Sequence, residues 1–202
     1  TIISNGLNPQ DNADTLALAK KHPIVRAAIG FYPVDVVLQD MQTQGVHYPH
    51  EGPTVSAEEG VDYVRTHAAA AFAIGEIGLD GYWVPEALWP KQERVFCELV
   101  EIAMAHQKTV IIHSRKRERR CFELLKELGA TKVDWHCYGS KVKLAKTIAE
   151  SLGHTFSIPA NARRNEAFSK MLQVLPREQI LFETDCPYLG PDKEQDNEPA
   201  HV

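Results

Sequence analysis

The chain has 202 residues, of which 44% are hydrophobic and 24% are charged. This ordinary globular composition supplies enough apolar residues for one sizeable core. Lys and Arg total 22 and Asp and Glu total 27, which gives a net charge of −5. Binding of long duplex nucleic acid by charge alone is therefore not expected.

The four cysteines show no CxxC spacing. Such a pattern fits an intracellular protein with reduced thiols better than a disulfide framework. No apolar run approaches the roughly 18 residues that a membrane span requires, and no signal peptide opens the chain. We therefore expect a soluble, cytoplasmic protein without membrane association.

Seven short apolar runs are typical of buried strands. Several are continuous rather than alternating in polarity, as parallel strands covered on both faces are. In chain order, the predicted strands are Thr1–Gly6, Arg26–Pro33, Ala73–Asp80, Thr109–Arg115, Lys132–Tyr138, His154–Ala160 and Ile180–Pro187.

Helical patterns with readable ends separate these strands. They cover Asp11–Lys20, Ser56–Ala71, Pro90–His106, Lys116–Leu128, Ser140–Leu152 and the residues from Asn165 to before Pro176. Asp11, Ser56, Ser140 and Asn165 are the predicted N-caps. Residues 39–53 form the one irregular insert and are predicted to be a loop.

Strand and helix alternate through the whole chain, which implies a parallel sheet, either doubly wound or closed into a barrel. No GxGxxG follows a strand, so a dinucleotide-binding sheet has no local support. Seven units are one fewer than the eight of a TIM barrel, which has about 250 residues. We predict a single α/β domain over residues 1–202, a TIM-type (β/α)8 barrel that lacks its first β/α unit and its last helix.

Four side chains of metal-ligand type stand at the ends of predicted strands: Glu76, His113, His136 and Asp185. The active site of a β/α barrel lies at the carboxyl ends of its strands. Two carboxylates and two imidazoles suit Zn, Mn or a similar divalent ion. One such residue alone is more often a core histidine or a helix cap, but four at the same end of four strands indicate a metal site.

Four motifs contain these residues: GEIGLD at 75–80, HSR at 113–115, HCYG at 136–139 and TDCP at 184–187. With these motifs in this order, nearly all of the chain resembles the TatD family of metal-dependent hydrolases. The resemblance implies a TIM-type barrel of the metal-dependent hydrolase type. It also implies a nuclease that cleaves phosphodiester bonds of DNA, short or single-stranded, by metal-activated water.

The resemblance also implies roles for the four residues. Glu76 would bridge two divalent ions (Mg, Mn or Zn), and His113 and His136 would bind one of them. Asp185 would bind the other ion and orient or deprotonate the attacking water, so Glu76 and Asp185 are the predicted catalytic residues. The family carries a His-x-His pair on its first strand, and this sequence has none. Whether the chain binds two ions or one is therefore left open.

Predicted substrate contacts are Arg115, Tyr82, Tyr32 and Arg163. Arg115 is next but one to a predicted ligand, and Arg163 follows a predicted strand, so both are placed to contact phosphate. Tyr82 is expected to stack on a base. Tyr32 stands where many relatives have a histidine. The alternative is that the arginines belong to solvated helix faces and that Tyr82 packs at the rim.

Two other functions are compatible with the residues. A barrel does not fix its substrate, so the first alternative is a metal-dependent amidohydrolase-type enzyme that acts on an amide or ester. The second is a catalytically impaired fragment or homologue that binds a metal or a partner without turnover. The sequence does not predict an oligomeric state.

Overall fold

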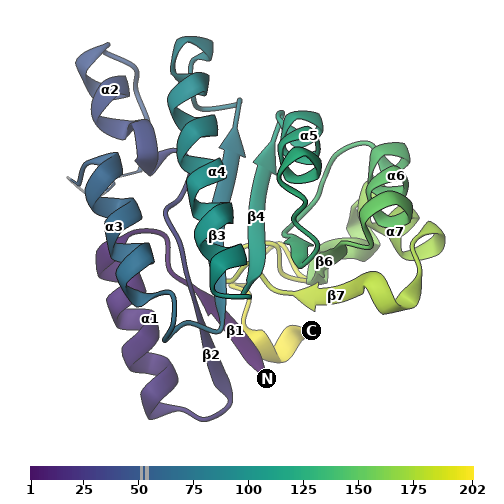
Figure 1. Ribbon diagram of the computed structural model, residues 1–202. Helices are drawn as coiled ribbons and strands as arrows, with labels where there is room; N and C mark the ends of the chain where they lie inside the picture. The colour runs from purple at the N-terminus through teal and green to yellow at the C-terminus, as the bar shows by residue number, and fades with distance from the viewer. Residues whose placement is uncertain (51, 53–54) are drawn as a thin grey trace. The chain divides into compact units, whose positions relative to one another are not determined.

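The structure is a computed structural model that describes residues 1–50, 52 and 55–202. It divides into two compact units, Thr1–Lys132 and Val133–Val202. Both units consist of parallel strands connected by helices (Figure 1). The prediction of a single domain over residues 1–202 stays a prediction.

The first unit contains a parallel sheet whose strands follow one another in chain order. The strands are β1 (Ile2–Asn5), β2 (Val25–Ile29), β3 (Ala73–Asp80) and β4 (Thr109–Arg115). The helices are α1 (Pro9–Lys21), α2 (Leu38–Thr43), α3 (Ala57–His67), α4 (Trp89–Ala105) and α5 (Glu118–Leu128), with short 3-10 helices η1 (Asp35–Val37) and η2 (Glu86–Leu88). Helix α1 packs on β2 and α4 packs on β3, while α3 contacts both helices (Figure 1).

The second unit repeats the pattern on a smaller scale. Its parallel strands are β5 (Val133–Trp135), β6 (Thr155–Pro159) and β7 (Ile180–Glu183). Its helices are α6 (Val142–Leu152) and α7 (Glu166–Val174), with 3-10 helices η3 (Ala160–Arg164), η4 (Arg177–Gln179) and η5 (Pro199–His201). Every crossover thus returns the chain to the same end of its sheet.

All seven predicted strands form, and β3 and β4 have their predicted bounds. The predicted caps Ser56 and Asn165 are confirmed, since Ser56 forms a capping box and Asn165 accepts hydrogen bonds from the first turn of α7. Asp11 does not cap α1, because Asn8 accepts from the first-turn amides instead. Ser140 likewise does not cap α6, which begins after Lys141.

The predicted loop at residues 39–53 is partly wrong. Residues 38–43 form α2, which continues from η1 and buries Leu38 and Met41 completely or nearly so. Tertiary packing of these two apolar side chains outweighs the weak local helix signal. Residues 51 and 53 of the predicted loop lie outside the described residues.

The cores of the two units differ in character. All eight residues of β3 are buried, and they pack mainly against the apolar face of α4. In the second unit three aromatic rings cluster, with Trp135 stacked on Phe156 and Tyr138 set edge-on to both. The indole N–H of Trp135 donates to Nδ1 of buried His154 over 3.1 Å. The buried indole is thus hydrogen-bonded, as buried polar groups must be.

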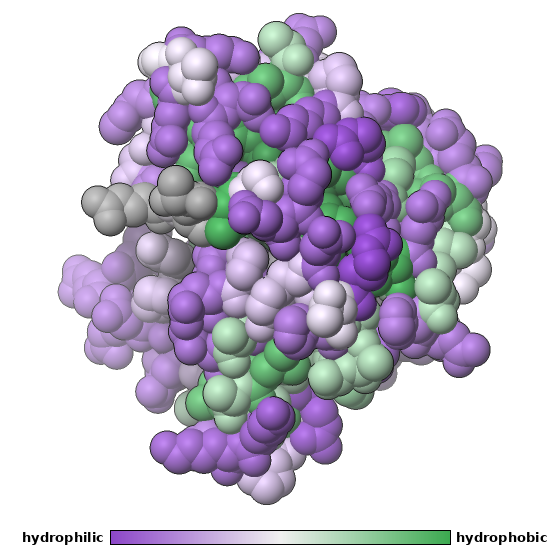
Figure 2. Space-filling view, turned by 60° about the vertical axis from the view of Figure 1, so that its left-hand side comes forward, coloured by the Kyte–Doolittle hydropathy of each residue, from purple (hydrophilic) through white to green (hydrophobic). Residues whose placement is uncertain are grey.

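Hydrophilic residues cover most of the face seen in Figure 2, with small hydrophobic areas between them. Among the helices of the described residues, none combines the length and the apolar character that crossing a membrane requires.

Strands β3 and β4 approach each other closely where Gly78 lies opposite His113. Gly78 has φ +151°, and a Cβ atom added there would lie 1.9 Å from the carbonyl oxygen of His113. Only glycine therefore allows this approach of the two strands.

We expect Gly78→Ala to lower the free energy of unfolding by about 2–5 kcal/mol, because it adds steric overlap to an unfavourable backbone conformation. Gly129→Ala is the matched control, since Gly129 also has a positive φ (+71°) but open space around its Cβ position. It should cost only about 1–2 kcal/mol. Urea unfolding of both variants measures the difference, and equal losses would contradict the steric argument.

A second prediction concerns Asp35, which is buried at the start of η1. Burial, with a smaller contribution from the charge of Asp11, raises the pKa of Asp35 to about 7. In the unfolded chain the value is about 4. The folded state therefore binds the proton more tightly, and wild-type stability falls as the pH rises from about 4 to 7.

The variant Asp35→Asn removes this dependence. Its free energy of unfolding relative to wild type should increase by up to roughly 4 kcal/mol between pH 4 and pH 8. Urea unfolding of both proteins across this range measures the difference. A relative stability that stays constant or decreases with pH would show that Asp35 is not the source.

Candidate metal centre

In the first unit, Glu76 of β3 and His113 of β4 point toward each other across neighbouring strands. The distance from Oε1 of Glu76 to Nδ1 of His113 is 3.1 Å. The other ring nitrogen of His113, Nε2, lies 3.0 Å from Oδ2 of Asp80. The imidazole is therefore placed between two carboxylates. Glu76 and Asp80 are four positions apart in β3, and this spacing puts their side chains on the same face.

Asp80 is completely buried at the end of β3. Its Oδ1 accepts hydrogen bonds from the backbone N–H groups of Tyr82 and Trp83, both over 2.7 Å. Burial alone would raise the pKa of Asp80, but the hydrogen bonds from His113 and these two amides lower it below its ordinary value. Asp80 is thus a stabilised buried anion.

The two carboxylates also determine the electrostatics of His113. Burial by itself lowers the pKa of this ring, but the hydrogen bonds and charges of Asp80 and Glu76 outweigh it and raise the pKa to about 9. The site of the first unit therefore favours positive charge between the two acidic side chains. A bound cation would meet the same field.

In the second unit, His136 follows β5 directly and also lies between two carboxylates. Its Nδ1 is 2.5 Å from Oε2 of Glu183, and its Nε2 is 3.5 Å from Oδ1 of Asp185. Oε2 of Glu183 also accepts from the hydroxyl of Ser157. Asp185 has φ 56°, so the chain turns sharply after β7 and the side chain does not continue the alternation of the strand.

The four predicted ligands thus form two pairs, Glu76 with His113 and His136 with Asp185, one in each unit. Among the described residues, no group of three or more His, Cys, Asp or Glu side chains is close enough together to hold an ion. The donor chemistry of each pair nevertheless fits a divalent ion. Imidazole and carboxylate are ligands of Zn and Mn, and a ligating histidine usually donates its second N–H to another carboxylate, as both rings here are placed to do.

Two predicted substrate contacts of the first unit, Arg115 and Tyr82, lie against each other. The guanidinium carbon of Arg115 is 4.0 Å from the centre of the Tyr82 ring, and Nζ of Lys116 is 4.7 Å from it. Tyr82 is 47% exposed. Its ring therefore attracts two cations, by roughly 0.5–1 kcal/mol for each at an exposed site. We call Tyr82, Arg115 and Lys116 the rim of the first unit.

The remaining two predicted contacts differ in their surroundings. Tyr32 meets the His113 ring edge-on at a centroid distance of 5.0 Å. Burial and the charge of Glu76 raise the pKa of its phenol, so Tyr32 stays a neutral hydrogen-bonding group beside the ligand. Arg163 is exposed in η3, directly after β6 in the second unit.

Three residues near these sites were not predicted. Asp80 lies four positions after Glu76 in the same strand, and this even spacing was the signal that could have found it. Glu183 has no such signal, because Asp185 lies beyond the end of β7. Tyr48 contacts Trp83 edge-on at 5.5 Å. Burial and the charges of Asp35 and Asp80 raise its pKa to about 12. Tyr48 lies in the predicted loop, where no sequence pattern indicated a contact with the site.

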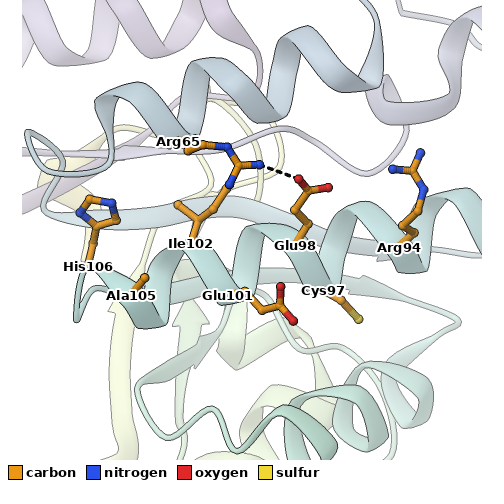
Figure 3. Close-up of a pocket in the computed structure, with 8 residues that line it drawn as sticks. All are labelled: Arg65, Arg94, Cys97, Glu98, Glu101, Ile102, Ala105 and His106. Carbon is orange, nitrogen blue, oxygen red and sulfur yellow. Dashed lines mark hydrogen bonds and ion pairs between the residues drawn. The ribbon is translucent and has the colours of Figure 1, made fainter.

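A groove of about 640 Å³ lies elsewhere in the first unit, between α3 and α4. Figure 3 shows its lining residues, with Arg65 of α3 paired to Glu98 of α4 over 2.6 Å. The others are Arg94, Cys97, Glu101, Ile102, Ala105 and His106. None of the predicted ligands lines this groove, so its residues supply controls for tests of the site.

Comparisons with known proteins agree with the motifs. An uncharacterized metal-dependent hydrolase of Methanocaldococcus jannaschii is 30% identical over 203 residues, which cover all of this chain and 72% of the relative. A putative deoxyribonuclease of Danio rerio is 29% identical, with 93% of this chain and 68% of the relative covered.

Solved structures show the same fold. A TatD homologue from Escherichia coli K12 matches with a TM-score of 0.79 at 22% identity, covering 98% of this chain and 73% of that one. A TatD family hydrolase from Entamoeba histolytica matches with a TM-score of 0.73. The predicted fold class, an incomplete TIM-type barrel of the metal-dependent hydrolase type, is confirmed by this similarity.

The family model described as "TatD related DNase" matches residues 1–202. The match covers the whole chain and includes all four motifs, so the chain belongs to the TatD related DNase family.

Proposed function

We propose that this chain, a metal-dependent hydrolase by its family, cleaves phosphodiester bonds of DNA. We also propose that Glu76, His113, His136 and Asp185 are its metal ligands. One observation carries the proposal: each predicted histidine faces a predicted carboxylate, over 3.1 Å within the paired strands β3 and β4 and over 3.5 Å just after β5 and β7. Relatives named deoxyribonuclease support DNA as the substrate.

The chemistry divides between the ions and the chain. When bound, divalent ions would activate a water molecule and neutralise charge on the phosphate. Glu76 would hold the ions in common, and the two histidines would fix one of them. Asp185 would accept the proton of the attacking water. As the new P–O bond forms, the bond from phosphorus to the leaving oxygen breaks and that oxygen takes up a proton.

The rim of the first unit suits a single strand of DNA. The cations of Arg115 and Lys116 are held over the Tyr82 ring, and they would contact phosphates. An exposed aromatic ring beside phosphate-binding cations is the common composition of single-strand binding surfaces. Arg163 would supply a second phosphate contact. The net charge of −5 makes such local cations necessary for binding a polyanion.

Imidazole and carboxylate ligands together suit Zn, whereas Mg and Mn would bind mainly through the carboxylates, and one or two ions are compatible with this set. Incubating the chain with a labelled single-stranded oligonucleotide and each ion in turn tests activity directly. Cleavage that a chelator abolishes is the expected result. Hydrolysis of amide or ester substrates without DNA cleavage would contradict the proposal.

The variant Glu76→Gln tests the site itself. We expect DNA cleavage to fall to the level of the chelated wild type, and bound metal to decrease with it, because one ligand charge is lost. The matched control is Glu101→Gln, which removes an exposed carboxylate of α4 in the groove of Figure 3. Activity assays and metal analysis should show the control unchanged. Full activity of Glu76→Gln would refute the ligand assignment.

The variant Arg115→Gln tests the rim. Loss of one phosphate contact should weaken single-stranded DNA binding and reduce the slope of log K against log salt by about 0.7. Fluorescence anisotropy titrations in chelator, where the strand is not cut, measure this slope. Arg119→Gln is the control, because Arg119 is an exposed arginine of α5 only four residues away. Identical slopes for the two variants would remove Arg115 from the substrate site.

A further inference from the structure

Each predicted histidine ligand lies between two carboxylates of different kinds. One carboxylate is itself a predicted ligand, Glu76 or Asp185. The other was not predicted: it is Asp80, which is completely buried, or Glu183, whose side chain is 11% exposed. These carboxylates contact the second nitrogen of the rings over 3.0 and 2.5 Å, respectively. Asp80 faces Nε2 of His113, whereas Glu183 faces Nδ1 of His136. The two units therefore present opposite ring nitrogens to their predicted ligand carboxylates.

This difference determines where the histidine protons can be. A neutral imidazole has one N–H donor and one nitrogen with a lone pair, and only the latter can bind a metal. An ionised carboxylate only accepts hydrogen bonds. With an ion bound beside the ligand carboxylate, the ring nitrogen on that side must present its lone pair, and the carboxylate on the other side then keeps the proton on the nitrogen that it faces.

On the basis of the proposed metal site, we propose that Asp80 and Glu183 are positioning residues that select the metal-binding nitrogen of each histidine. Asp80 holds the proton of His113 on Nε2, so that His113 binds metal through Nδ1, the nitrogen that faces Glu76. Glu183 holds the proton of His136 on Nδ1, so that Nε2, the nitrogen that faces Asp185, binds metal.

Asp80 offers the sharper test, because its surroundings fix how an asparagine would sit. The backbone amides of Tyr82 and Trp83 can only donate, and both donate to Oδ1. In Asp80→Asn the amide oxygen must therefore occupy the Oδ1 position, and the NH₂ group must face Nε2 of His113. An NH₂ group donates, so Nε2 must accept and the proton moves to Nδ1. The nitrogen that should bind metal is then blocked, while the loop contacts remain.

The surroundings of Glu183 do not fix the orientation of an amide at this position. The Ser157 hydroxyl that contacts it over 2.5 Å can either donate or accept, so Glu183→Gln does not force one orientation of the amide. Asp80→Asn is therefore the informative substitution. Its matched control at pH 8, above the pKa of about 7 of Asp35, is Asp35→Asn, which also removes a buried negative charge of the first unit, one that raises the pKa values of Tyr32 and Tyr48 beside the site.

The experiment measures zinc affinity of the complete chain by competition with a chromogenic chelator. We expect Asp80→Asn to raise the Kd for zinc by about 10–100-fold, the usual effect of losing the outer partner of a histidine ligand. Asp35→Asn should change it much less. Equal Kd values for Asp80→Asn and Asp35→Asn would overturn the proposal, since the effect would then be one of charge alone.

A second measurement needs no variant at Asp80, so it stands even if Asp80→Asn fails to fold. In zinc-loaded wild type with ¹⁵N-labelled histidine, two-bond ¹H–¹⁵N spectra identify the protonated nitrogen of each ring. The expected result is a proton on Nε2 of His113 and on Nδ1 of His136. A proton on the opposite nitrogen of either ring would overturn the assignment for that ring.

The variant Glu76→Gln separates this inference from the proposed function. If Glu76→Gln binds zinc as tightly as wild type, the proposed metal site fails, and the role of Asp80 fails with it. If Glu76→Gln loses zinc but Asp80→Asn retains wild-type affinity, the metal site stands and only the positioning role is refuted.

Discussion

The hydrogen bond between the buried carboxylate of Asp80 and the ring of His113 connects the core of the first unit to its chemistry. A carboxylate that is removed from water must be compensated by charge or by hydrogen-bond donors. Asp80 meets this requirement with two backbone amides and one imidazole N–H. The same contacts that stabilise the end of β3 therefore fix the ring of a predicted ligand.

The second unit satisfies the same requirement with different residues. The side chain of Glu183 is only 11% exposed. Its Oε2 accepts hydrogen bonds from both His136 and Ser157. Burial raises its pKa above the ordinary value, although these hydrogen bonds oppose the shift. Glu183 is thus less well compensated than Asp80. The strand ends of both units therefore give each ring a fixed, non-ligand partner, although β5 and β7 are far shorter than β3.

The parts of the fold that local sequence determines were predictable. Continuous apolar runs predicted the correct bounds of β3 and β4, because such runs are typical of parallel strands that are buried on both faces. The caps Ser56 and Asn165 were readable because their partners lie within four residues. Asn8 was missed as a cap because Asp11, three residues later, is an equally good capping type.

Other features depend on contacts between distant residues, and no local pattern contains them. Helix α2 forms because Leu38 and Met41 find apolar cover, and Tyr48 reaches Trp83 across 35 positions of sequence. Asp80 belongs to the GEIGLD motif, but its burial and its contact with His113 depend on the pairing of β3 with β4. The candidate ligands were predicted from residue type and from a place at the strand ends, but Glu76 and His113 lie inside β3 and β4. The nitrogen that each ring presents required the geometry.

The two oxygens of Asp80 serve different parts of the molecule. Oδ1 holds the backbone of Tyr82 and Trp83, the segment whose ring carries the rim cations, while Oδ2 holds His113. The side chain of Asp80 therefore connects the backbone of Tyr82 and Trp83 directly to the ring of His113. Under the proposed function, binding of a nucleic-acid strand at the rim and binding of an ion by His113 would be linked equilibria, and each would change the affinity for the other by the same factor.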